Sequence, residues 1–137
     1  MITTITKKTS VNRQWHLIDL KGQTLGRAST HIAELLMGKG KTYYAPNVDC
    51  GDYVVVVNSA AVKVTGQKQT DKLYRHHTGH PGGFRELTFT QVAAKDPTEI
   101  IRHSVSGMLP KNKLRDPRLK RLKLYEGVSH PYADKLS

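Results

Sequence analysis

The segment YVVVVN, residues 53–58, contains four consecutive valines and constrains the fold more than any other part of the chain. Valine is β-branched and favours extended backbone. The run does not alternate apolar with polar residues, so both faces of the resulting strand are expected to be buried. A strand buried on both faces is typical of a parallel sheet with helices packed against it. The segment therefore predicts an α/β fold.

An amphipathic helix is predicted upstream of this strand. WHLIDL, residues 15–20, reads as a short apolar strand, and a turn over 21–27 leads into a helix over about 24–37. GKGK, residues 38–41, should end the helix with a glycine and place cations near its negative end. The apolar residues with helical spacing form one predicted buried stripe: Leu25, Ala28, Ile32, Leu35 and Leu36.

Further elements are predicted downstream of the central strand. Residues 60–66 and 71–77 are strand candidates around a turn at Gly66. Residues 88–96 are a candidate short helix, and 96–110 a longer one with an apolar stripe.

Two of the predicted helices begin with an Asp-Pro pair. Asp96 can cap the longer helix, Pro97 suits its first position, and Glu99 stands where a capping box has its acidic residue. Residues 115–127 repeat the Asp-Pro start and predict a short basic helix with a final strand at 122–125. The order of elements predicts an α/β sandwich with a small, mostly parallel sheet.

The length and composition suit one domain. A chain of 137 residues can bury one sizeable core, and it shows no internal repeat or low-complexity linker. We predict a single domain over 1–137, with a polar amino-terminal arm at 1–13 and a peripheral tail at 128–137.

The charge is strongly positive and unevenly distributed. The chain has 22 Lys and Arg against 11 Asp and Glu, a net charge of +11 that predicts a polyanionic partner. Residues 59–85 hold five cations with one carboxylate, and 111–125 hold seven with one. A membrane-bound helix would need a large apolar face, and 111–125 contain no Trp or Phe, so nucleic acid is favoured over a membrane. The candidate phosphate-binding cations are Lys63, Lys68, Lys72, Arg75, Arg85, Lys111, Lys113, Arg115, Arg118, Lys120, Arg121 and Lys123.

The segment YRHHTGHPGG, residues 74–83, raises the question of a metal site. Its H-H-x-x-H pattern lacks the Glu of the zinc-protease motif, and its glycines and proline disfavour the helix that this motif needs. We therefore predict no metal and interpret the segment as an RNA-contacting loop, in which Arg and His can donate to phosphate or ribose and Tyr can stack. The candidate contacts are Tyr74, Arg75, His76, His77 and His80.

The turn GQTLGR, residues 22–27, allows two interpretations. It joins a strand to a helix amino terminus, where free N–H groups can bind phosphate and Arg27 could assist. It is also compatible with a plain turn in which Thr24 caps the helix. Residues 38–42 lack the first glycine of a P-loop and follow a helix rather than precede one, so they are not a nucleotide motif.

Cys50 is the only cysteine, which excludes an internal disulfide. Asp49 and Asp52 stand beside it and would raise the pKa of its thiol, which is the wrong direction for a nucleophile. No cofactor motif is present. We therefore predict no cofactor, and none of these motifs points to an enzyme.

Several segments together resemble the bacterial type of the large-subunit ribosomal protein thirteen family. Two resemble its hallmark segments: VTGQKQTDKLYRHHTGHPGG at 64–83 and GMLPKNKL with LKRLKLYEG at 107–127. WHLIDLKGQTLGRAST at 15–30 and YAPNVDCGDYVVVVN at 44–58 match as well. The resemblance covers about residues 13–127.

The resemblance implies a three-layer α/β/α sandwich around a four-stranded parallel sheet. It implies a structural protein, not an enzyme, that binds large-subunit ribosomal RNA, contacts neighbouring ribosomal proteins, supports early subunit assembly and does not form homo-oligomers. It places the protein in the ribosome, either cytoplasmic or organellar. The chain departs from the family pattern at Ser106, where relatives often carry a basic residue, at Arg115-Asp116-Pro117, where many have Gly, and at Cys50.

Two other functional classes remain open at this point. A regulator that binds messenger RNA would share the basic surface. A nucleotide-handling α/β enzyme would instead use the carboxyl edge of the sheet and the turn at residues 22–27.

Overall fold

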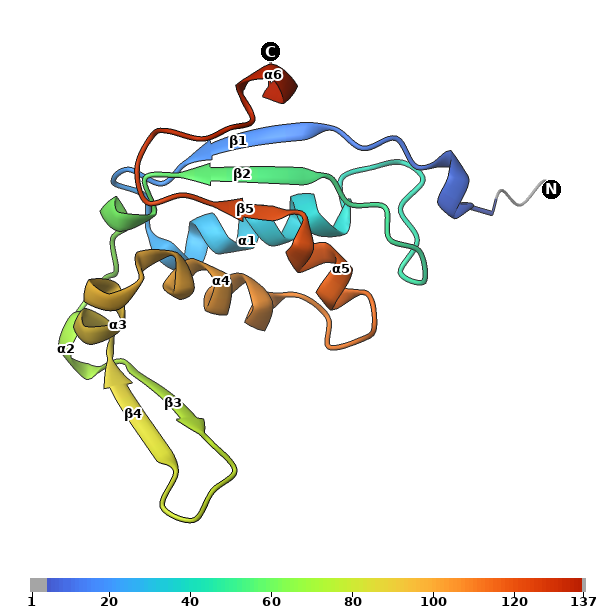
Figure 1. The fold of residues 1–137 in the computed structure, drawn as a ribbon. Coiled ribbons are helices and arrows are strands. Elements are labelled where there is room, and N and C mark those ends of the chain that lie inside the picture. Colours follow the sequence, from blue (N-terminus) through green and yellow to red (C-terminus); the bar gives the residue numbers. More distant parts are fainter. Residues whose placement is uncertain (1–4, 137) are drawn as a thin grey trace.

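The structure is a computed structural model and describes residues 5–136. Figure 1 shows a sheet with helices packed below it and a two-stranded hairpin that projects away from the body. The elements, in chain order, are β1 (Trp15–Asp19), α1 (Leu25–Met37), β2 (Tyr53–Val57), α2 (Lys68–Asp71), β3 (Leu73–His77), β4 (Phe84–Thr88), α3 (Phe89–Lys95), α4 (Pro97–Met108), α5 (Arg115–Lys120), β5 (Leu122–Leu124) and α6 (Ala133–Leu136).

The main sheet is parallel and has the order β1-β2-β5. The fold is therefore α/β, as predicted, and the valine run is its buried central strand. The expectation of four strands is wrong, because within residues 5–136 the sheet has three. Residues 60–66 do not join it: the chain turns through a 3-10 helix at Ser59–Ala61, and Lys63 makes only an isolated bridge to Thr24.

The strand predicted at 71–77 forms, but it pairs outside the main sheet. β3 is antiparallel to β4, and together they make a separate hairpin. Residues 84–88 were not predicted to be a strand. Their extended conformation depends on pairing with β3, which a local pattern in FRELT does not reveal.

The core lies between one face of the sheet and the helices. Val54 and Val56 of β2 point into it, with buried residues of α1, α3 and α4 packed against them. α1 ends at Gly38, whose left-handed backbone (φ +74°) accommodates the cap, as predicted. At the start of α4, the Asp96 carboxylate accepts a hydrogen bond from the Thr98 N–H at 2.9 Å.

The predicted capping box at Asp96 and Glu99 is not formed: the Asp96 carboxylate accepts from the Thr98 N–H, and the Glu99 N–H donates to the Asp96 main-chain carbonyl at 3.3 Å. A capping box occurs one helix earlier. Thr88 and Gln91 satisfy each other's backbone N–H groups at the start of α3. The Thr-x-x-Gln pattern in TFTQ carried this signal.

The second face of the sheet is covered by the end of the chain. The Trp15 ring stacks on Tyr53, with centroids 4.3 Å apart, and on Tyr132, with centroids 5.0 Å apart. Figure 1 shows the segment after β5 crossing to this face and ending in α6 beside β1. Leu17 of β1 stays 51% exposed there. Among the helices of residues 5–136, none is long and apolar enough to cross a membrane.

Candidate RNA-binding surface

The β3–β4 hairpin presents the glycine- and histidine-rich segment at its tip. The turn is closed by backbone hydrogen bonds from the Thr78 N–H to the Gly83 carbonyl (3.0 Å) and from the Gly83 N–H to the His80 carbonyl (2.8 Å). A Cβ on Gly83 would lie 1.9 Å from the Thr78 hydroxyl oxygen and 2.8 Å from that carbonyl, so only glycine fits. The tip is therefore a hydrogen-bonded turn with a defined backbone conformation.

The hairpin exposes five of the side chains predicted to contact RNA. Arg75, His76, His77, His80 and Arg85 are all exposed. The register places His76 directly opposite Arg85, so neither of these two side chains has a carboxylate as its cross-strand neighbour. Arg75 differs in having a carboxylate partner, because its Nε donates to Glu86 at 2.9 Å. The histidines lie on a strand and a turn, which is not the helical geometry of a zinc motif.

Tyr74 is placed differently from its neighbours. Its ring packs against the core and lies edge-on to His103, with centroids 5.3 Å apart, while Lys72 Nζ lies 5.4 Å from the ring centroid. Burial raises the pKa of the Tyr74 phenol. The face of this ring is already used inside the protein, so we leave Tyr74 out of the stacking contacts to RNA.

A second group of predicted cations gathers around the start of α1. Lys68 and Lys72 line a cavity of about 180 Å³ together with Thr24, Gly26 and Ser104. Lys63 is held beside the same turn, because its backbone bonds to Gln23 and Leu25. Arg27 is exposed on the first turn of α1. The fold thus brings the cations of residues 63–72 next to the start of α1, which the sequence predicted as a possible phosphate site.

The turn at residues 22–27 is closed by the protein itself. The N–H groups of Gly22 and Leu25 donate to the carbonyls of Ala61 and Lys63, at 3.3 and 2.8 Å. The Thr24 side chain makes no capping hydrogen bond, so that part of the plain-turn interpretation is wrong. With two of its N–H groups engaged, the turn does not offer the open cradle that a nucleotide-binding enzyme needs.

The basic segment 111–123 divides into three parts. Lys111, Lys113 and Lys120 are exposed on α5 and the loop before it, and Arg115 is half-buried there. Lys123 lies in the middle of β5 opposite Val55, on the sheet face away from α1 and α4. The loop before α5 and the hairpin lie at opposite ends of α4 (Figure 1), a helix of 12 residues and about 18 Å.

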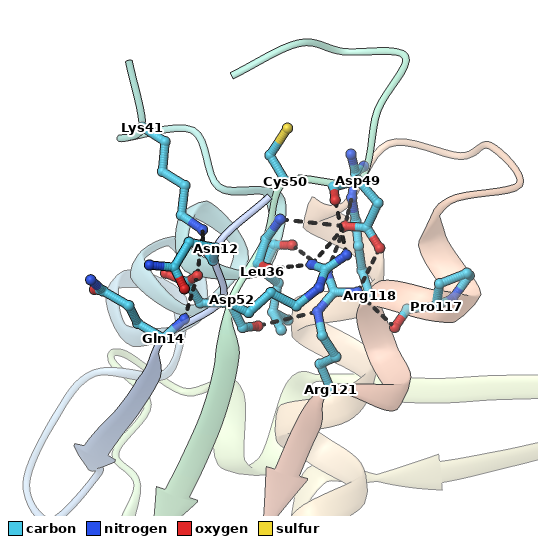
Figure 2. Close-up of polar contacts among 12 residues, drawn as sticks. Asn12, Gln14, Leu36, Lys41, Asp49, Cys50, Asp52, Pro117, Arg118 and Arg121 are labelled. Carbon is cyan, nitrogen blue, oxygen red and sulfur yellow. Dashed lines mark hydrogen bonds and ion pairs between the residues drawn. The ribbon is translucent and has the colours of Figure 1, made fainter. Parts of the chain in front are cut away.

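Arg118 and Arg121 do not belong to this surface, which corrects their predicted role. They are 1% and 7% exposed, and Figure 2 shows both side chains gathered around Asp49 inside the fold. Arg121 binds both carboxylate oxygens of Asp49, at 2.5 and 2.6 Å, and donates to the Leu36 carbonyl at 3.0 Å. The Arg118 Nε lies 3.7 Å from Asp49. A guanidinium held in this way is not free to bind phosphate.

These ion pairs extend into a larger, partly buried ionic network, made of Arg13, His16, Lys41, Asp49, Asp52, Arg118 and Arg121. Asp52 accepts from Lys41 Nζ at 2.5 Å and lies 2.8 Å from His16 Nε2. Arg13 donates to the carbonyls of Gly51 and Asp49. The network lies where the three parallel strands begin, and Figure 2 shows the strands leading away from it.

The two carboxylates of the network are held ionised. Burial alone would raise the pKa of Asp49, but the hydrogen bond and charge of Arg121 and the charge of Arg13 outweigh it and lower the pKa. Burial likewise opposes ionisation of Asp52, and Lys41, the Gln14 N–H and His16 more than compensate, so its pKa is also lowered. Sequence reasoning considered these carboxylates only as neighbours of Cys50. Two carboxylates just before a buried strand were the signal for partners of buried cations.

Cys50 is fully buried between these carboxylates. Within residues 5–136, no group of three or more His, Cys, Asp or Glu side chains is placed to hold a metal ion.

Comparison with known proteins decides the family. The model of the family described as ribosomal protein L13 matches residues 13–131. The chain belongs to the ribosomal protein L13 family. It is 48% identical to the large ribosomal subunit protein uL13 of Syntrophotalea carbinolica, covering 97% of this chain and 94% of the relative. It is 50% identical to the protein of the same name in Geobacter sulfurreducens (95% and 91% covered) and 51% identical to that in Rubrobacter xylanophilus (90% and 86% covered).

Family membership confirms the resemblance that the hallmark segments indicated. It places the chain among structural ribosomal proteins of the translation apparatus, not among enzymes. The closed turn at Gly22 and Leu25 agrees with that assignment.

Proposed function

We propose that this protein is a structural constituent of the large ribosomal subunit that binds large-subunit ribosomal RNA and supports early assembly of that subunit. The names of its relatives support the subunit. The bacterial sources of these relatives support a cytoplasmic ribosome. Within the subunit, neighbouring ribosomal proteins are further partners, and the protein acts as one copy and not as a homo-oligomer.

One observation carries the RNA-binding part of the proposal: the cations are sorted by the fold. Arg118 and Arg121, which pair with Asp49, are buried, whereas the exposed cations of the hairpin and of the loop before α5 outnumber nearby carboxylates. Exposed cations on fixed secondary structure suit a structured phosphate backbone, because each neutralised phosphate releases counterions. A-form RNA is recognised largely through its shape, phosphates and 2′-hydroxyls.

Two RNA-binding surfaces are proposed on this basis. The hairpin surface consists of Arg75, His76, His77, His80 and Arg85, with Lys63, Lys68, Lys72 and Arg27 beside its base. The α5 surface consists of Lys111, Lys113, Arg115 and Lys120, with Lys123 on the adjoining edge strand. Because the two surfaces lie at opposite ends of α4, they can contact separate RNA segments and hold them in a fixed relation.

Sedimentation of a gentle lysate through a sucrose gradient tests the proposed function. The chain should migrate with the large subunit and remain there after a moderate-salt wash. Recovery only in the light fractions would contradict the proposal, and a specific transcript bound in those fractions would favour the messenger-RNA regulator instead. Cells depleted of the protein should accumulate incomplete large-subunit particles if it acts early in assembly.

A further inference from the structure

The hairpin exposes one large aromatic side chain that the positive charge of its surface does not explain. The chain has two phenylalanines. Phe89 is 6% exposed and belongs to the core, whereas Phe84 is 54% exposed at the start of β4, directly after the hairpin tip. Single exposed apolar residues are common on protein surfaces. What makes Phe84 different is its surroundings.

Phe84 stands among hydrogen-bond donors. The register pairs it with His77, and Arg75 lies further along β3 on the same face of the hairpin. The Gly79 N–H donates to His77 Nδ1 at 2.9 Å, so the neutral His77 ring carries its proton on Nε2 and offers a donor there. His80 lies in the adjoining turn. These donors do not suit an apolar protein partner. They suit a nucleotide, in which a flat base lies next to phosphate and ribose oxygens.

The position of Phe84 is also fixed before any partner binds. It follows Gly83, the residue around which the turn closes without room for a Cβ. Side chains alternate along the hairpin, so Phe84 lies on the face opposite Tyr74 and Leu87, which pack against the core. Within residues 5–136, its ring has no stacked or edge-on aromatic neighbour. The ring is therefore held out from the body with its faces available.

We propose that Phe84 stacks on an unpaired base of the bound RNA, while His77, on the same face of the hairpin, contacts the phosphate and ribose oxygens beside that base. This inference rests on the proposed RNA-binding function and adds the kind of RNA that the hairpin meets. An uninterrupted duplex keeps its bases stacked on one another, so the hairpin tip is directed at a loop, bulge or strand end, where a base can be splayed out onto an aromatic ring.

Binding of the full-length chain to transcribed bacterial large-subunit ribosomal RNA tests the proposal, with four variants measured over a range of salt concentrations. Phe84→Ala and Phe84→Leu should weaken binding about 5- to 100-fold, the range that base–aromatic stacking gives. Phe84→Trp should stay within about two-fold of the parent, because it keeps a stacking surface. The slope of affinity against salt should not change in any of them, since no charge is removed. Val128→Ala, which trims an exposed apolar residue outside the hairpin, is the matched control and should bind like the parent.

Ultraviolet crosslinking of assembled large subunits supplies a second readout. Mass spectrometry should recover the peptide that carries Phe84 joined to a nucleotide. Parent-like binding by Phe84→Leu would overturn stacking in favour of simple apolar contact, and a crosslink from Phe84 to a ribosomal protein would replace the base with a protein partner. Parent-like binding by Phe84→Ala would remove Phe84 from the interface but leave the proposed function standing. Absence of RNA binding by the parent chain would instead refute the proposed function itself.

Discussion

The ionic network at the start of the strands and the exposed hairpin use the same kinds of side chain for opposite purposes. In the network, each buried arginine lies within ion-pair distance of Asp49, and the guanidinium groups hold the ends of β2 and β5 together. On the hairpin, the cations lie on a projecting element, and only Arg75 has a carboxylate on the opposite strand. A cation's contribution therefore depends on where the fold places it: buried with a partner it holds the fold, and exposed without one it is available to a polyanion.

Removing the shared carboxylate should have the largest effect. Asp49→Asn leaves Arg118 and Arg121 buried without a counter-charge, which is expected to lower the free energy of unfolding by about 3–5 kcal/mol. Urea unfolding followed by circular dichroism measures this loss. Glu126→Gln, at an exposed carboxylate, is the control and should change stability by no more than about 0.5 kcal/mol. Equal stability of the two variants would show that the network does not support the fold.

Neutralising exposed cations should change RNA binding and leave the fold intact. In the triple variant Lys111→Gln, Lys113→Gln and Lys120→Gln, affinity for large-subunit ribosomal RNA should fall about 10- to 100-fold at low salt. The slope of log affinity against log salt should become shallower by about 2 to 3, at roughly 0.7–0.9 for each lost phosphate contact. Filter binding over a salt series measures both quantities, with unfolding curves to confirm that stability is kept. An unchanged slope would remove the α5 surface from the interface.

The sequence predicted the α/β class because two patterns were strong: the valine run and the helical stripe of α1. It also predicted the Asp96 cap, since an Asp-Pro pair is a local signal. At α5 the same pair does not cap, because the helix already begins at Arg115 and has no side-chain cap. Prediction from the sequence failed where structure depends on distant partners. The extended state of 84–88 requires β3, and the burial of Arg118 and Arg121 requires Asp49, about 70 residues away in the sequence. In a basic run whose helix packs on the core, composition does not distinguish cations that face the solvent from those that face inward.

Acid should weaken the ionic network, because it protonates the two carboxylates that hold the cations. The pKa values of Asp49 and Asp52 are lowered in the folded protein, so both carboxylates stabilise it fully above the unfolded pKa of about 4. That stabilisation should be lost as the pH falls through the lower folded pKa values. The contribution of Asp49 to this loss should stay below the effect of Asp49→Asn as long as the carboxylate is only partly protonated. Thermal unfolding between about pH 6 and pH 2 measures the loss, and Asp52→Asn should lose less stability over this interval than the parent. A variant that loses as much would place the acid sensitivity outside Asp52.

The smallest expected effect comes from the one ion pair that the hairpin does contain. Arg75 and Glu86 are exposed, so Glu86→Gln should cost only about 0.2–1 kcal/mol of stability. RNA binding should move the other way and strengthen by about two- to five-fold, because the change removes a carboxylate from the hairpin surface and frees Arg75 for a phosphate. Filter binding of Glu86→Gln and Arg75→Gln, measured side by side, separates the effect of the carboxylate on RNA binding from that of the guanidinium. Weaker binding by Glu86→Gln would mean that Glu86 orients Arg75 toward the RNA, so that a carboxylate partner can also prepare an exposed cation for its ligand.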